Sequence, residues 1–146
     1  MRELTTRKKA ETADTLTIPL AHLLALADPL RDDPWTGTGP YTPDQIHAEL
    51  AHPTRCPHPH VDSTCRACHV RRIAHFVTHP PKSSDPHPIE IDVGLGTWTP
   101  NWPLLDGNHR VAAHTLRGDP RITVAYAGDV DRALAVLVDG ANPDDT

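Results

Sequence analysis

The sequence predicts a small α+β domain, and three observations support this prediction. Short segments alternate apolar and polar residues, as half-buried strands do, whereas longer segments repeat apolar residues at helical spacing. The two kinds of segment follow one another in mixed order, and a length of 146 residues suits a single domain. We expect a small mixed sheet flanked by helices over residues 15–138, between a disordered tail at 1–14 and an acidic tail at 139–146.

One strand and three helices are expected in the first half of the chain. Leucine and isoleucine alternate with threonine and proline in the strand, whereas the helices repeat apolar residues every three or four positions. Thr42, Pro43 and Gln45 supply a capping hydroxyl, a proline at the first helical position and a glutamine that completes a capping box. The expected strand covers about 16–20, the helices 20–27, 43–52 and 65–78, and the loops 29–41 and 53–64.

Three strands and two helices are expected in the second half. Ile89, Ile91 and Val93 alternate with acidic residues, which is typical of a half-buried strand. Gly118 ends the first of the two helices as a left-handed cap, and Asp129 caps the second. The expected strands cover about 89–93, 103–105 and 122–126, and the helices 108–117 and 130–138.

Charge and hydropathy restrict the classes of function. The formal net charge of −5 argues against a generally basic nucleic-acid-binding protein. Arg66, Arg71 and Arg72 leave a local contact with DNA phosphates open, although a solvated helix face is the simpler interpretation. No apolar run is long enough to span a membrane and the N-terminus lacks a signal-peptide pattern, so we expect a cytoplasmic protein without a membrane partner. The oligomeric state is not indicated.

All three cysteines lie close together, which is typical of a metal site and not of a disulfide framework. Cys65 and Cys68 have the spacing of a zinc knuckle, and Cys56 precedes them in a segment rich in histidine. Four protein ligands would make the zinc structural, within an insert at about 53–70, whereas free or redox-active thiols are the alternative. We expect the ligands Cys56, His58, Cys65 and Cys68, with His60 and His69 as rivals for the histidine position.

The segment Asp106-Gly107-Asn108-His109-Arg110 is the most indicative of function, because it joins an expected strand to the start of an expected helix. Amides at a helix N-terminus are unpaired and electropositive, and Gly107 allows the backbone to approach a phosphate. We expect the amides of Asn108 and His109 to face the anion and Arg110 to bind its oxygens. His109 either does likewise or assists proton transfer, and Asp106 holds a divalent cation or orients His109. A simple helix cap does not explain the His-Arg pair in a first turn.

Three segments of the second half carry a family resemblance. They are Pro88-Ile89-Glu90-Ile91, then Leu105-Asp106-Gly107-Asn108-His109-Arg110-Val111-Ala112-Ala113, and Arg121-Ile122-Thr123-Val124. The second contains Gly107, Arg110 and Ala113 as Gly-x-x-Arg-x-x-Ala. On these segments the chain resembles the ParB/sulfiredoxin superfamily from about Leu16 to Val138. Asn108 stands where sulfiredoxins carry a reactive cysteine, so sulfinate reduction is not expected.

The resemblance implies a compact ParB/sulfiredoxin-like fold that binds a nucleotide, ATP or CTP, with Mg²⁺. It implies an NTP-dependent hydrolase, a phosphotransferase or a nuclease, of plasmid or phage type. The alternative hypothesis is a non-catalytic, zinc-stabilised accessory module that binds DNA or protein. The expected catalytic residues are Asp106, His109 and Arg110, and the expected nucleotide-binding residues are Gly107, Asn108, His109 and Arg110.

Overall fold

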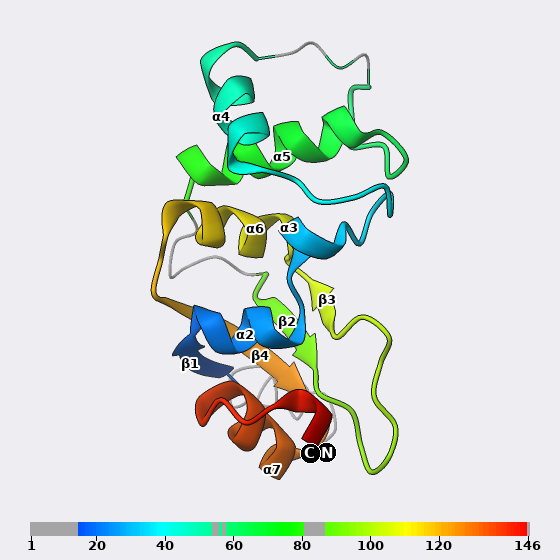
Figure 1. Cartoon of the computed structure of the whole chain (residues 1–146), viewed down its shortest axis with the longest axis vertical. Coiled ribbons are helices and arrows are strands. Elements are labelled where there is room, and N and C mark those ends of the chain that lie inside the picture. Colours follow the sequence, from blue (N-terminus) through cyan, green and yellow to red (C-terminus); the bar gives the residue numbers. More distant parts are fainter. Residues whose placement is uncertain (1–14, 54–55, 57, 81–86, 146) are drawn as a thin grey trace, which may run out of the picture. The chain divides into compact units, whose positions relative to one another are not determined.

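A computed structural model describes residues 15–53, 56, 58–80 and 87–145, so the tail expected at 1–14 lies outside the described residues. The α+β class is confirmed, with a mixed four-stranded sheet and flanking helices (Figure 1). The chain divides into two compact units that are interleaved along the sequence. Among the described residues, the first unit takes 15–26, 87–107 and 120–145, and the second takes those of 27–80 and 108–119.

The sheet belongs to the first unit, and its strands are adjacent in the order β1-β4-β2-β3. β1 (Thr15–Pro19) pairs antiparallel with β4 (Arg121–Ala127). β2 (Ile89–Asp92) runs parallel to β4 and antiparallel to β3 (Leu104–Asp106). The alternation expected for these strands places their isoleucines in the core of the unit, whereas the intervening Glu90 is exposed.

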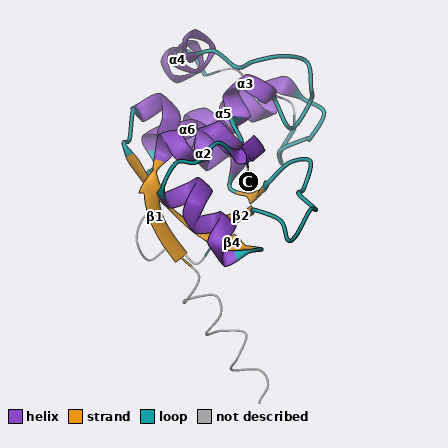
Figure 2. Cartoon of the chain, turned by 60° about the horizontal axis from the view of Figure 1, so that its bottom comes forward, coloured by secondary structure: helices purple, strands orange, loops and turns teal. Residues whose placement is uncertain are grey.

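Helices that follow the first and the last strand complete the core of the first unit. α2 (Leu20–Leu26) follows β1 directly, and α7 (Val130–Ala133) continues into the π-helix η1 (Leu134–Val138), which packs against α2 and β1 (Figure 2). The helix expected at 130–138 is therefore present, and its second half has π-helical hydrogen bonding. There the amide of Asp139 donates to the carbonyl of Leu134, five residues earlier, at 2.9 Å. The buried apolar residues of this unit include Ile18, Leu20, Leu23, Ile89, Ile91, Leu104, Ile122, Val124, Val136 and Leu137.

Gly107 follows β3 with a φ of 92°, in the left-handed region that side chains rarely adopt. A Cβ atom at this position would lie 2.7 Å from Cγ1 of Ile89. We expect Gly107→Ala to cost about 1–3 kcal/mol more than Gly96→Ala, because both substitutions impose backbone strain but only the first adds a steric clash. Gly96 has a φ of 59° and open space around it. Denaturant unfolding of the two variants measures the difference, and equal costs would contradict the close contact with Ile89.

The second unit consists of helices. α6 (Asn108–Arg117) packs against α3 (Pro29–Asp32) and α5 (Arg66–Thr78), and α4 (Pro43–Ala51) packs against α5. The capping box expected at the start of α4 is present, since the Gln45 amide donates to Oγ1 of Thr42 at 3.2 Å and the Thr42 amide donates to Oε1 of Gln45 at 2.8 Å. The core cluster contains Leu30, Tyr41, Ile46, Ile73, Ala74 and Ala112.

The loop expected at 29–41 was wrong for its first residues, which form α3. Asp28 caps this helix by accepting hydrogen bonds from the amides of Leu30 and Arg31, at 3.1 and 3.2 Å, and Pro29 occupies the first helical position. Four residues are too few to display an apolar repeat, so composition alone indicated a loop.

The longest helix in the described segments is α5, which has 13 residues. No helix in these segments is long and apolar enough to cross a membrane.

Candidate metal centre

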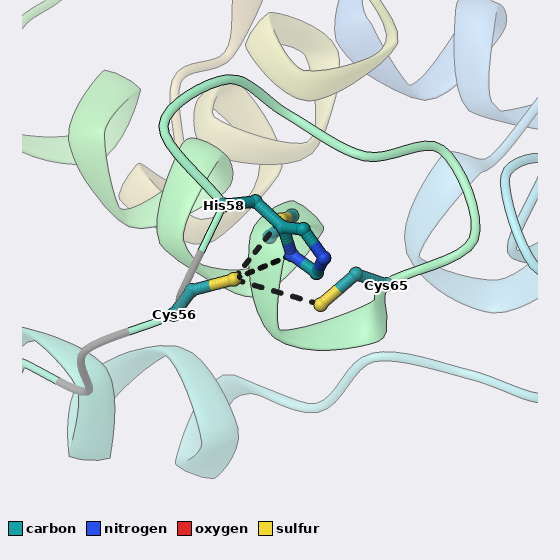
Figure 3. Close-up of side chains that lie close together, drawn as sticks. Cys56, His58 and Cys65 are labelled. Carbon is teal, nitrogen blue, oxygen red and sulfur yellow. Dashed lines mark hydrogen bonds between the residues drawn. The ribbon is translucent and has the colours of Figure 1, made fainter.

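Four side-chain donors converge where α5 begins (Figure 3). The Sγ atom of Cys56 lies 3.1 Å from Sγ of Cys68, 3.6 Å from Sγ of Cys65 and 3.1 Å from Nδ1 of His58. The same nitrogen of His58 lies 3.4 Å from Sγ of Cys68, and all four donor atoms are within 4.8 Å of one another. The sulfur atoms are too far apart for disulfides, whose S–S bond is about 2.05 Å, and all three cysteines are free thiols.

The spacing of these donors suits a small tetrahedral ion. Bonds of about 2.3 Å to sulfur and 2.0 Å to nitrogen place the ligands of a zinc tetrahedron about 3.5–3.8 Å apart. The donor distances in the cluster, 3.1–3.6 Å where they are in closest contact, are near these values. The cluster could therefore hold a metal ion through four protein ligands with little rearrangement.

The thiols of the cluster lie in contrasting electrostatic environments. Burial raises the pKa of the Cys68 thiol to about 11, whereas a hydrogen bond from the amide of His58 lowers the pKa of Cys56. Cys65 is the N-cap of α5 and makes no side-chain capping bond, and Cys68 lies in the first turn, where the helix dipole favours negative charge. A buried thiolate still needs a positive partner, which a bound divalent ion would supply.

Asp62 faces the far side of the His58 ring, a contact that the sequence analysis missed. Its Oδ2 atom lies 3.6 Å from Nε2 of His58, while Nδ1 of that ring faces the sulfur atoms. The carboxylate is oriented by Thr64, whose amide and hydroxyl donate to Oδ1 at 2.8 and 2.6 Å. Metal-binding histidines commonly present their second ring nitrogen to a carboxylate, which fixes the tautomer and the ring orientation. In the sequence, this contact could have been inferred from the Asp-x-Thr turn that lies between His58 and Cys65.

The two rival histidines do not join the cluster. His60 is exposed, and His69 is buried with other partners. Nε2 of His69 lies 3.1 Å from the carbonyl oxygen of Ser63, and its Nδ1 lies 2.9 Å from Nε2 of His109. Among the expected alternatives, His58 is thus the histidine that lies with the three cysteines.

The residues of the Asp106–Arg110 segment belong to different units. Asp106 ends β3 in the first unit, and its carboxylate accepts a hydrogen bond from the amide of Gly107 at 2.8 Å. Asn108, His109 and Arg110 form the first turn of α6 in the second unit. Arg110 is buried, with 9% of its surface exposed, and His109 is half-buried.

His109 is held by an aromatic stack that the sequence did not reveal. Its ring lies 4.4 Å from that of Trp35 at an interplanar angle of 9°, and Trp35 also stacks on His69 at 4.8 Å. Because the Ser63 carbonyl can only accept, Nε2 of His69 donates to it, while Nδ1 of His69 and Nε2 of His109 share one hydrogen bond. Burial lowers the pKa of His109 to about 3, so the ring is uncharged near neutral pH.

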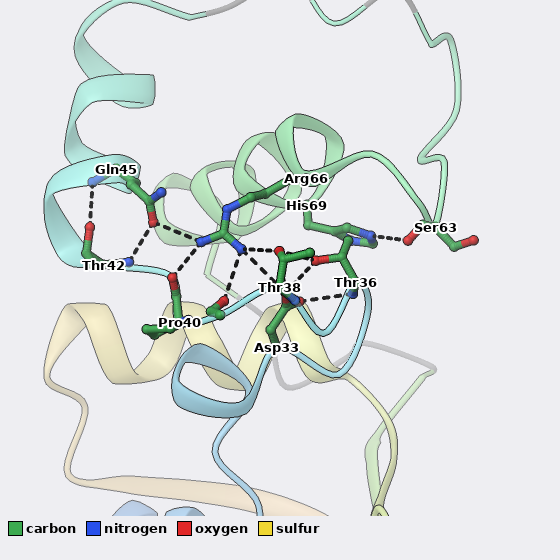
Figure 4. A network of polar contacts seen from close by, with 10 residues as sticks. Asp33, Thr36, Thr38, Pro40, Thr42, Gln45, Ser63, Arg66 and His69 are labelled. Atoms are coloured by element: carbon green, nitrogen blue, oxygen red, sulfur yellow. Dashed lines mark hydrogen bonds and ion pairs between the residues drawn. The ribbon is translucent and has the colours of Figure 1, made fainter.

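The three arginines at the start of α5 have different environments. Arg66 is not on a solvated face as expected: its guanidinium lies 3.9 Å from the centre of the Tyr41 ring and donates to the carbonyl oxygens of Gly39 and Pro40 (Figure 4). Arg71 is half-buried and donates to the carbonyl of His58 at 3.4 and 3.5 Å, whereas Arg72 is exposed. Of these three arginines, Arg71 and Arg72 thus remain as candidates for contact with DNA phosphates.

Comparison of the sequence with protein-family models finds no match, and comparisons with curated proteins and with solved structures find none either. The chemistry of the residues described above is therefore the basis for assigning a function.

Proposed function

We propose that the chain is a nucleotide-binding protein of the ParB/sulfiredoxin type, supported by a structural zinc ion. Three thiolates and one imidazole are a typical zinc donor set, and the cluster of Cys56, His58, Cys65 and Cys68 supplies all of them. Four protein ligands leave no position for a reactive water molecule. The zinc would therefore stabilise the loop before α5, and the chemistry would take place elsewhere.

The first turn of α6 is the observation on which the nucleotide proposal rests. Arg110 is buried in the first turn of α6, and backbone amides at a helix N-terminus can in general receive an anion. A guanidinium can bind phosphate oxygens through two parallel hydrogen bonds, which are strong where water is excluded. A nucleotide phosphate is the ligand that suits this combination.

The uncharged state of His109 restricts both of its expected roles. An uncharged imidazole contributes little to holding a phosphate, and a pKa of about 3 makes it a weak proton acceptor, so it would act by orienting a water molecule or hydroxyl group through a hydrogen bond. This role suits hydrolysis of ATP or CTP, phosphotransfer or phosphodiester cleavage. Mg²⁺ would neutralise the charge of the reacting phosphate. Asn108 remains the expected backbone contact within this turn.

Arg110→Lys should weaken binding of ATP or CTP by about 10- to 100-fold, because a lysine keeps the charge but loses the paired hydrogen bonds. Arg31→Lys is the matched control, since Arg31 is exposed and pairs with Asp32 at 2.9 Å. Calorimetric titration with each nucleotide and Mg²⁺ measures the affinities, and thermal melts verify that both variants fold. Unchanged affinity in a folded Arg110→Lys variant would refute the site.

The same proteins, assayed with and without DNA, separate the enzyme from the alternative. Nucleotide turnover that is lost in Arg110→Lys supports a hydrolase or phosphotransferase, and cleavage of the DNA that is lost in the same variant supports a nuclease. Binding without turnover favours a non-catalytic zinc-stabilised module.

A further inference from the structure

A hollow of about 500 Å³ opens beside the metal cluster, within the second unit. Residues 59–61, which lie between the ligands His58 and Cys65, form one wall, and α5 forms the other. Arg71 joins the two walls by donating to the carbonyl oxygen of His58. The lining residues are Pro59, His60, Val61, Arg71, Arg72 and His75.

The charge of this hollow is opposite to that of the chain. Two arginines and two histidines line it and no carboxylate does, although the formal net charge of the chain is −5. A concave surface with one sign of charge concentrates the electric field and attracts ligands of the opposite sign. The ligand class indicated is therefore anionic. Each guanidinium has five N–H donors, so Arg71 retains donors beyond those that face His58.

Flat rings lie next to these cationic groups. The Arg72 guanidinium is 4.5 Å from the centre of the Phe76 ring, and the exposed rings of His75 and His79 stack at 4.2 Å with an interplanar angle of 12°. Rings beside arginines at a groove are the combination that binds unpaired nucleotides, because phosphates contact the cations while bases stack on the rings. A single phosphate ion has no base that could stack on these rings.

We propose that this hollow binds a single-stranded nucleic acid, with Arg71 and Arg72 contacting phosphates and His75 stacking on a base. A concave pocket accepts an unpaired strand, whereas duplex DNA is usually contacted by a helix or ribbon that protrudes into a groove. The site is separate from the first turn of α6, so it does not depend on the proposed nucleotide site. Because residues 59–61 lie between two metal ligands, binding should also depend on the metal.

Fluorescence anisotropy with an end-labelled single-stranded oligonucleotide of about 12 nucleotides tests the proposal. Arg72→Gln should weaken binding several-fold and reduce the slope of log affinity against log salt by about 0.7, the value for one lost phosphate contact on a single strand. His75→Ala should weaken binding about tenfold through lost stacking. Both side chains are exposed, so the variants should fold, which circular dichroism verifies. Arg31→Gln, an exposed arginine outside the hollow, is the control.

Three results would overturn the assignment. The first is wild-type affinity in both Arg72→Gln and His75→Ala. The second is equal affinity for a duplex of the same sequence, which would remove the preference for an unpaired strand. The third is that Arg110→Lys loses oligonucleotide binding while Arg72→Gln keeps it, which would place the strand at the first turn of α6. Oligonucleotide binding that survives Arg110→Lys while nucleotide binding is lost separates the two sites, and weaker binding after chelation supports the link to the metal.

Discussion

His58→Ala is expected to lower the thermal midpoint of the protein far more than His60→Ala, with a loss of more than about 4 kcal/mol. Nδ1 of His58 lies 3.1 Å from Sγ of Cys56 and 3.4 Å from Sγ of Cys68, whereas His60 is exposed. Removing the imidazole leaves three thiolates crowded together without their neutral ligand. Since the loop before α5 has few apolar residues of its own, most of its folding free energy should come from metal binding, which contributes about 10–16 kcal/mol in zinc-finger peptides.

Thermal melts followed by circular dichroism, together with metal analysis of each purified variant, measure this effect. Wild-type protein and His60→Ala should each carry about one zinc ion per chain, and chelation should lower their midpoints toward that of His58→Ala. A wild-type zinc content near zero, combined with a midpoint that chelation does not change, would contradict a structural zinc site.

The cluster of three cysteines and one histidine could be predicted because its information is local. Its four residues lie within a short segment, and the spacing of Cys65 and Cys68 already indicates a knuckle. Spacing favoured His58 over His60 and His69 but could not exclude either of them. The structure shows why His69 does not join the cluster. His69 is turned to Ser63 and His109 because α5 packs against α6.

Contacts between distant segments could not be predicted in this way. The ring of His109 meets that of His69, 40 positions earlier, and both stack on Trp35 from a segment expected to be only a loop. The same reason applies to the fold: alternation indicates a strand and a helical repeat indicates a helix, but neither says which segments pack together. The interleaving of two units along the chain is a property of that packing.

Asp33 combines one such distant contact, with Arg66, with hydrogen bonds from residues close to it in the sequence, and its replacement is expected to have the second large effect. Its side chain is fully buried and accepts hydrogen bonds from the amides of Thr36 and Thr38, at 3.1 and 2.9 Å, and from the hydroxyl of Thr36 (Figure 4). Arg66 approaches the same carboxylate to 3.4 Å. Asp33→Ala should cost about 3–5 kcal/mol, because it removes one partner of a buried ion pair and leaves several donors without an acceptor. Denaturant unfolding at pH 7 measures this loss.

Asp33→Asn is the informative companion, because asparagine has a similar size and tolerates the φ of 45° at this position but carries no charge. Burial alone would raise the pKa of Asp33, but the hydrogen bonds from Thr36 and Thr38 outweigh it and hold the pKa well below its usual range. A carboxyl group with a lowered pKa in the folded state stabilises the protein above its unfolded pKa of about 3.9, and this contribution disappears as the pH falls further. The stability difference between wild type and Asp33→Asn should therefore be constant from pH 7 to 5 and shrink below about pH 4. If the proposed zinc dissociates in acid, both proteins lose it alike, so its effect cancels in the difference. A difference that stays the same at pH 3 would show that the charge of Asp33 does not stabilise the fold.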